Sequence, residues 1–249
     1  MEELPTLNSG CTRMTCCGKK LHNHCAAGVW QSSMTFDLKN TCVMCRTKKV
    51  YAGTKEDIKR IRKWVKKGKP WAKAMLGNSY REGIGVSQSY ERARYYYELA
   101  GVQEPMAMTN LGILYETGLG VAQSYEKAKE LYEIGVEHGE AGAQNNLAGL
   151  HYFGRSTEQS YKKAIPLYKM SAAQGSAPPM NSIGYAYVHA HGVQKSLIKA
   201  REWFAKSAAL GDEYGIKQLK SMDDKQREAA SLDPNAIVCS LCGLPETET

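Results

Sequence analysis

Cysteines are the residues in this sequence whose type and spacing point most directly to chemistry. Six of the eight stand in the first 45 residues and two near the end: Cys11, Cys16, Cys17, Cys25, Cys42, Cys45, Cys239 and Cys242. Zinc takes four thiolate or imidazole ligands in a tetrahedron, and a C-x-x-C pair lets two thiolates from one turn reach the same ion. The spacing therefore predicts zinc binding, with metal-free thiols and disulfides as the other interpretations.

The front of the chain holds a second pair with this spacing, because two residues also separate His22 from Cys25. Interleaved pairs that end in C-x-x-C resemble the second half of a RING zinc finger, in a variant with a Cys-Cys-Gly-Lys core. The resemblance implies two zinc sites, whose ligands would be Cys16, Cys17, Cys42 and Cys45 in one and His22 and Cys25 in the other. A RING finger has one more C-x-x-C pair upstream, where this chain offers only Cys11.

The pair Cys239 and Cys242 has no other cysteine or histidine near it in the sequence. Three interpretations fit this tail. The pair is the first half of a zinc finger that continues beyond this sequence, or it supplies the ligands missing from the front of the same or a neighbouring molecule, or it binds no metal.

The RING resemblance also implies an activity. A RING finger forms no covalent intermediate; it binds a ubiquitin-conjugating enzyme and positions its thioester-linked ubiquitin for attack. Arg46 directly follows the last ligand, where the family has an arginine that contacts ubiquitin; a solvent-exposed residue in a basic run is the other interpretation. The resemblance implies a RING-type ubiquitin-protein ligase, and the missing ligand pair favours the alternative of a non-enzymatic zinc-binding adaptor.

The elements that must position these sites are dominated by an internal repeat of 35–36 residues. Four five-residue segments align at this step and begin at Leu76, Leu111, Leu147 and Ile183. Each is followed by a glycine-containing turn and then by an alanine with an aromatic residue four places later, namely Ala93–Tyr97, Ala128–Tyr132, Ala164–Tyr168 and Ala200–Phe204. Four matches in phase indicate a repeat architecture.

Helical geometry explains the slots of this repeat. A leucine and a tyrosine at i and i+4 share one helix face, and the Gly or Ala between them lets another helix approach closely. The G-x-G-V turns end the first helix, although the third unit lacks the second Gly and the Val, and Ser89, Ser124 and Ser160 are placed to cap the second helix. Nine of the 15 tyrosines fill repeat slots, which predicts core packing. The third unit, with His151 in a tyrosine slot and Pro166 in its second helix, is expected to be the least regular.

These motifs resemble the Sel-1-like repeat family, a relative of the tetratricopeptide repeats. The resemblance implies a right-handed α-solenoid that scaffolds protein complexes, often around ubiquitin-dependent turnover. The expected fold class is mostly α, a solenoid of helix–turn–helix repeats with a small N-terminal zinc-finger-like module. The expected domains are a partial RING-like module over 1–50, a basic linker helix over 51–70, four repeats over 71–212, a capping helix over 213–232 and a tail over 233–249. In the capping helix, Ile216 and Leu219 are expected to face inward.

The distribution of charge and hydropathy indicates which classes of partner the chain can bind. Residues 1–70 hold 15 of the 33 basic residues but 5 of the 25 acidic ones, so the excess positive charge precedes the repeats. The basic linker helix is expected to bury Ile58, Ile61 and Val65 against the first repeat. It lacks a groove-reading motif, so protein partners are favoured over nucleic acid. No signal peptide or stretch of roughly 18 apolar residues is present, which predicts a cytoplasmic or nuclear protein without a membrane span.

Overall fold

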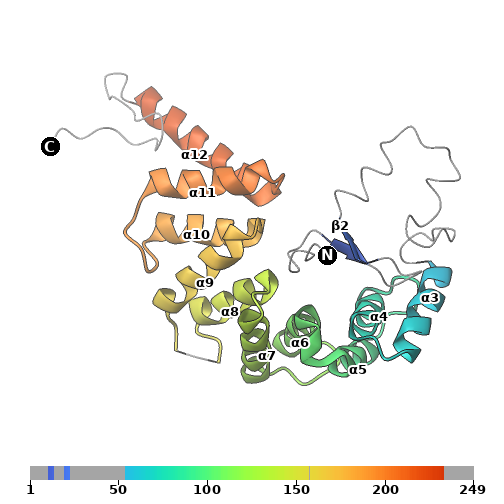
Figure 1. The fold of residues 1–249 in the computed structure, drawn as a ribbon. Helices are drawn as coiled ribbons and strands as arrows, with labels where there is room; N and C mark the ends of the chain where they lie inside the picture. Colours follow the sequence, from blue (N-terminus) through green and yellow to red (C-terminus); the bar gives the residue numbers. More distant parts are fainter. Residues whose placement is uncertain (1–10, 14–19, 23–53, 157, 233–249) are drawn as a thin grey trace, which may run out of the picture. The chain divides into compact units, whose positions relative to one another are not determined.

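The computed structural model describes residues 11–13, 20–22, 54–156 and 158–232, and nearly all of these are helical (Figure 1). The chain divides into two compact units, which we call unit 1 (Met1–Ile134) and unit 2 (Gly135–Thr249). The mostly α fold predicted from the repeat is confirmed.

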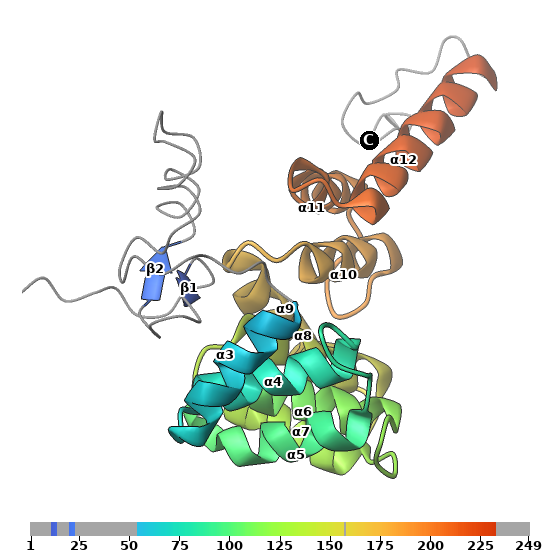
Figure 2. The same cartoon turned by 90° about the vertical axis from the view of Figure 1, so that its right-hand side faces the viewer.

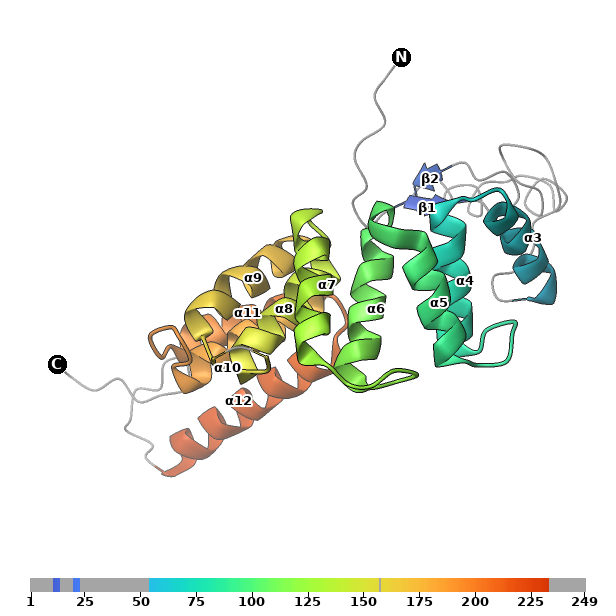
Figure 3. The ribbon, with the colours of Figure 1, turned by 90° about the horizontal axis from the view of Figure 1, so that it is seen from below.

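Unit 1 contains two short strands and the first helices. The strands β1 (Cys11–Arg13) and β2 (Lys20–His22) pair antiparallel. The helices are α3 (Lys55–Lys66), α4 (Pro70–Glu82), α5 (Tyr90–Ala100), a 3₁₀ turn η1 (Gly101–Gln103), α6 (Pro105–Thr117) and α7 (Tyr125–Glu137), whose last turn crosses the unit boundary. Helices α4, α5 and α6 lie side by side (Figure 3), and α3 lies beside α4 (Figure 2).

Unit 2 continues the same pattern of paired helices. Its elements are α8 (Ala141–Phe153), α9 (Tyr161–Ala173), α10 (Ala177–His189), α11 (Leu197–Ala209) and α12 (Glu213–Leu232). Helices α10, α11 and α12 form successive layers (Figure 1). The predicted repeats therefore correspond to α4–α5, α6–α7, α8–α9 and α10–α11.

The alanine and aromatic slots of the repeat form the core. The four alanines are fully buried, and the aromatic side chains that follow them are at most 4% exposed: Tyr97, Tyr132, Tyr168 and Phe204. A Cβ added at Gly77 would stand 2.6 Å from the Tyr97 ring, and one at Gly184 would stand 2.7 Å from the Phe204 ring. The small residue in the first helix therefore leaves room for an aromatic ring from the second helix to pack against it, as the sequence predicts.

The turns and caps also follow the prediction. Gly83 and Gly118 end their helices with left-handed backbone at φ 73°, a conformation that glycine adopts without a Cβ clash. The hydroxyls of Ser89, Ser124 and Ser160 accept hydrogen bonds from the backbone N–H three residues later, at 3.3–3.4 Å. Each serine therefore satisfies one of the N–H groups that a helix start leaves unpaired.

The third repeat departs from the pattern in its turn and not in its helix. Pro166 lies inside α9, yet α9 keeps 13 residues and Pro166 is exposed. The proline removes one backbone N–H donor near the start of the helix, on the solvent side, so the helix continues. Ser156 occupies the slot of the second turn glycine and adopts φ 58°, which is unfavourable for a residue with a Cβ.

The two end helices bury different faces. In α3, Ile58 and Ile61 are buried and Val65 packs against the core of unit 1, as expected. In α12 the prediction that Ile216 faces inward is wrong, because its side chain is 51% exposed. Gly215 faces α11 instead: a Cβ there would meet the Phe204 carbonyl oxygen at 3.0 Å. With Gly215 inward, Leu219 one turn later is half-buried, and Ile216 turns to solvent.

Candidate functional site

Most of the residues predicted to bind zinc lie outside the described part of the chain. These are Cys16, Cys17, Cys25, Cys42, Cys45, Cys239 and Cys242, and the proposed ubiquitin-contacting Arg46 lies there too. The backbone is described at Cys11 and His22, which face each other as partners across the β1–β2 pair. The donor set of thiols and one imidazole in residues 11–45 suits zinc. Zinc binding thus stays a prediction.

Within the described residues, no group of three His, Cys, Asp or Glu side chains is placed to hold a metal ion. No helix among those described has the length and apolar character needed to cross a membrane. The candidate binding site in the repeats is therefore a surface groove.

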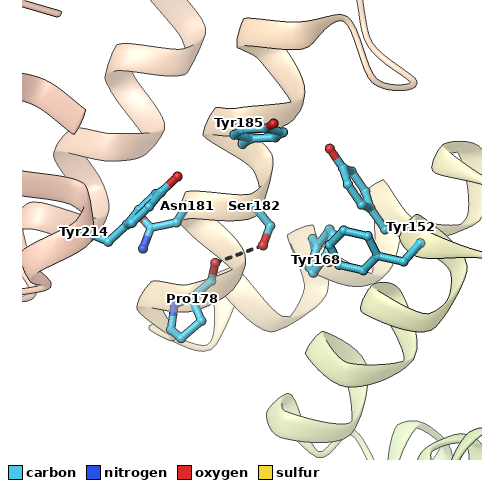
Figure 4. A pocket seen from close by; sticks show the side chains of 8 residues that line it. Tyr152, Tyr168, Pro178, Asn181, Ser182, Tyr185 and Tyr214 are labelled. Carbon is cyan, nitrogen blue, oxygen red and sulfur yellow. Dashed lines mark hydrogen bonds between the residues drawn. The ribbon is translucent and has the colours of Figure 1, made fainter. Parts of the chain in front are cut away.

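A groove of about 460 Å³ opens in unit 2 (Figure 4). Four helices supply its aromatic walls: Tyr152 and Phe153 come from α8, Tyr168 from α9, Tyr185 from α10 and Tyr214 from α12. The remaining lining residues come from α10 and are Pro178, Asn181 and Ser182. Five of the eight lining residues carry aromatic rings and none carries a formal charge, so the groove offers mainly ring surface.

The rings of the groove differ in how much surface they leave open. Tyr152 is 6% exposed, and its ring meets those of Phe153 and Tyr168 edge-on at centroid distances of 5.1 and 6.1 Å. Phe153, Tyr185 and Tyr214 are 62%, 42% and 45% exposed. The groove therefore combines one buried tyrosine, which packs on Phe153, with three large aromatic side chains that face solvent.

A polar pair lies beside this aromatic surface. The Asn181 amide donates from Nδ2 to Asp212 Oδ2 at 2.8 Å, and Asp212 also accepts from the Gly215 N–H at 2.9 Å at the start of α12. The hydrogen bond from the Gly215 N–H, and then that from Asn181, lower the pKa of the Asp212 carboxyl. Asp212 is thus held as a carboxylate next to a groove-lining residue.

Histidines complete one end of the aromatic cluster. The Tyr152 hydroxyl is hydrogen-bonded to His191 Nδ1, and the His191 ring stacks on Tyr161 at 4.6 Å with 2° between the planes. Burial raises the pKa of the Tyr152 hydroxyl above its ordinary value. His189 packs on Tyr185 at 4.1 Å. Both histidines at this turn therefore pack against tyrosines of the groove.

The equivalent positions in unit 1 are polar and satisfied. Asn78 Oδ1 accepts from the Tyr97 hydroxyl at 2.7 Å and from the Asn110 amide at 2.9 Å, and Arg81 donates to Asn110 Oδ1 at 2.9 Å. Burial raises the pKa of Tyr97 to about 12, which keeps its hydroxyl a donor. The same surface of the first helices is therefore a closed hydrogen-bond network in unit 1 and an aromatic groove in unit 2.

Comparison with known proteins places these repeats in a family. The model of the Sel1 repeat matches residues 72–101, 105–140, 141–176 and 180–212, which is more than half of the chain. The chain belongs to the Sel1 repeat family. Its repeats mark it as a scaffold for protein–protein interaction, and its partners accordingly include proteins.

Solved structures share this fold. The crystal structure of a Sel1 repeat protein from Oxalobacter formigenes is 30% identical to this chain, with a TM-score of 0.63, over 68% of this chain and 69% of that one. A second, the protective antigen c5321 of uropathogenic Escherichia coli, is 28% identical with a TM-score of 0.63, over 71% of this chain and 38% of that one. Comparison with curated protein sequences finds no match.

The aromatic groove was missed in the sequence analysis. Tyr152 and Tyr185 stand five and two residues after the repeat leucine or isoleucine, at positions that vary among the four repeats. Their signal was the replacement of Arg81 and Asn78, at the same offsets in the first repeat, by aromatic residues. Tyr214 gave a weaker signal, because it lies outside the four repeats.

Proposed function

We propose that this chain is a scaffold that holds a segment of a partner polypeptide in the aromatic groove of unit 2. The observation that supports this most is the set of exposed rings of Phe153, Tyr185 and Tyr214 around one cavity. Tyrosine and phenylalanine dominate the energetics of protein interfaces, because they bury large area with little loss of conformational freedom. Such a groove suits side chains of an extended segment.

The test is selection of binding peptides. A library of random dodecapeptides is selected on the immobilised full chain, and enriched peptides are measured against the purified chain by fluorescence polarisation. If the groove is the binding site, the affinity of the selected peptides for the chain should fall about tenfold or more when Tyr185 and Tyr214 are both changed to Leu. The matched control is Tyr95→Leu, a tyrosine that is 55% exposed on α5 in unit 1. Peptides that bind the double variant as tightly as the natural chain would refute the groove.

We further propose that the front segment binds zinc and recruits a ubiquitin-conjugating enzyme, so that the partner on the repeats is a substrate. This rests on the ligand spacing of residues 16–45 and on Arg46 after the last ligand. The test is in vitro ubiquitination with a panel of conjugating enzymes. Ubiquitin chains that depend on the natural chain and disappear with Arg46→Ala support the proposal; no chains with any conjugating enzyme refute it.

The alternative function is a non-enzymatic adaptor with a structural zinc module. It is favoured by the absence of a C-x-x-C pair upstream of Cys16. Elemental analysis separates the two. One zinc ion per chain matches a half-built module, whereas two ions require the second site to be completed, and a double change of Cys239 and Cys242 to Ser tests whether the tail completes it.

A further inference from the structure

We propose that the unit 2 groove selects a positively charged side chain, Arg or Lys, from the partner segment. This rests on the proposed function and names the chemistry of the occupant. Three observations support it. Other tyrosines of the repeats have a basic side chain over the ring, the groove tyrosines have none among the described residues, and the Asp212 carboxylate lies beside the groove.

The repeat tyrosines at the ends of the first helices are covered by cations from the chain itself. In the first, second and fourth repeats, Tyr80, Tyr115 and Tyr187 each have a basic group over the ring, at 5.5, 5.1 and 5.7 Å from the centroid. The basic residue stands twelve positions later in every case: Arg92, Lys127 and Lys199. The face of an aromatic ring carries negative potential and attracts a cation. This architecture therefore repeatedly pairs a tyrosine with a positive charge.

The groove tyrosines have no such cover. Among the residues that the structure places, no cation lies over the rings of Tyr152, Tyr185 or Tyr214. Arg155 is over Phe153 at 5.4 Å from the centroid, at the rim of the groove. His189 packs on the Tyr185 ring at 4.1 Å, but Tyr185 and Tyr214 are both still more than two-fifths exposed, so a cation from outside can reach their rings.

A carboxylate is fixed beside the wall of the groove that Asn181 forms. The Asp212 carboxylate is fixed by the groove residue Asn181 and by the start of α12, and the exposed Glu213 follows it directly before Tyr214. The Asp212 carboxylate is held by a lining residue, and none of the eight lining residues carries a positive charge; the cation at the rim, Arg155, lies over Phe153. The field beside Asn181 and Tyr214 therefore favours a cation. An acidic or purely apolar occupant gains less here than a basic one.

The occupant is therefore a partner segment with an arginine or lysine whose cation lies on the ring faces and whose charge faces Asp212. Arginine fits better than lysine, because its planar guanidinium stacks on aromatic rings and is more weakly hydrated than an ammonium. A basic segment from a second copy of this chain would meet the same groove, and self-association is therefore one of the outcomes tested.

The test compares two pools of fluorescein-labelled dodecapeptides that differ only at a fixed central residue, arginine in one and citrulline in the other. Citrulline keeps the planar shape and removes the charge. We expect the arginine pool to bind the full chain about fivefold more tightly or better at low salt. Raising the salt should reduce this preference, because exposed charges are screened.

Variants assign the preference to the groove. Tyr214→Leu should remove most of the preference for arginine while Tyr214→Phe, which keeps a ring face, retains it. Glu213→Gln should reduce the preference in part, and Tyr95→Leu should leave it unchanged. Circular dichroism checks that each variant is folded.

The outcomes separate the inference from the proposed function. Equal binding of both pools, lost in the Tyr185 and Tyr214 double variant, overturns the charge preference and leaves the peptide groove intact. A preference for arginine that survives the double variant also overturns it, because the cation then binds elsewhere. Concentration-dependent dimers of the free chain that the arginine pool dissociates would overturn a separate partner as the occupant and assign the groove to a second copy.

Discussion

Units 1 and 2 are built from the same repeat, but the surface of their first helices carries polar residues in unit 1 and aromatic residues in unit 2. Two residues after the repeat leucine or isoleucine stands Asn78 in the first repeat and Tyr185 in the fourth. In unit 1 that position is an acceptor for a core tyrosine; in unit 2 it is an exposed ring beside a cavity. The difference teaches that the core slots define the fold, while the positions between them decide what the surface can bind.

The buried aromatic residue of the second helix also differs between the units, in whether it carries a hydroxyl group. In unit 1 the hydroxyls of Tyr97 and Tyr132 reach polar first-helix residues, Asn78 and Glu116, both at 2.7 Å. In the fourth repeat Phe204 fills this slot and has no hydroxyl to satisfy. The fourth repeat can therefore carry Tyr185 in place of the polar Asn78 without leaving a core hydroxyl unpaired, whereas the third repeat keeps a hydroxyl on Tyr168.

The largest expected effect comes from the buried aromatic position that occurs in every repeat of both units. Phe204→Ala should lower the free energy of unfolding by about 3–5 kcal/mol, because a ring that is 1% exposed leaves a cavity. Repeat arrays couple mainly between neighbours, so hydrogen exchange should show the loss of protection in α10 to α12 and not in α4 to α6. Equal loss in both units would mean that they unfold as one.

The next effect tests the close approach of the paired helices. Gly112→Ala should destabilise by about 1–3 kcal/mol, because the new Cβ would stand 2.6 Å from the buried Tyr132 ring. The matched control is Gly149→Ala in α8, where the nearest atom is the Tyr168 hydroxyl at 3.8 Å. That change should stabilise by about 0.5–1 kcal/mol through helix propensity. Urea denaturation measures both, and the same sign for the two would contradict this packing.

A smaller effect tests the polar network of unit 1. Tyr97→Phe should cost about 1 kcal/mol, because it removes the hydroxyl that donates to Asn78 Oδ1 in the interior. Tyr95→Phe, at an exposed neighbouring position, should change the free energy of unfolding by less than about 0.5 kcal/mol. If both changes cost the same, the network does not contribute to stability.

The smallest effect concerns the irregular turn of the third repeat. Ser156→Gly should stabilise by about 0.5–1 kcal/mol, because Ser156 holds φ 58° and its buried hydroxyl has no hydrogen-bond partner among the residues that the structure describes. Gly120→Ser, at the same slot of the second repeat, should destabilise, since a Cβ there would stand 2.6 Å from that of Tyr90. Thermal denaturation of the two variants measures both signs, and a destabilised Ser156→Gly would show that the serine suits its turn.

The sequence predicted the repeats well because their slots are fixed by helix geometry. An alanine followed by an aromatic residue at i+4 specifies one packed face wherever it occurs, so the cores of all four repeats were identified correctly. The inward face of α12 was assigned wrongly because Gly215 takes the place expected for an apolar side chain. A glycine carries no hydrophobic signal, and only the contact with α11 reveals its role.

The groove could not be predicted in the same way. Tyr152, Tyr185 and Tyr214 come from three helices, and no spacing along the chain brings them to one cavity. Of the nine repeat tyrosines predicted to pack in the core, four are buried and five are half-buried: Tyr80, Tyr97, Tyr132 and Tyr168 in the first group, and Tyr90, Tyr115, Tyr125, Tyr161 and Tyr187 in the second. Tyrosine in this repeat serves both packing and surface, and neighbouring helices decide which.

The most direct test of the account replaces single tyrosines by p-benzoyl-phenylalanine and irradiates the full chain with a selected, labelled peptide. The replacement at Tyr214, in the groove of unit 2, should crosslink to the peptide. The replacement at Tyr95, which is more exposed but lies outside the groove in unit 1, should not. Crosslinking at Tyr95 in preference to Tyr214 would contradict the claim that the aromatic groove of unit 2 holds the partner polypeptide.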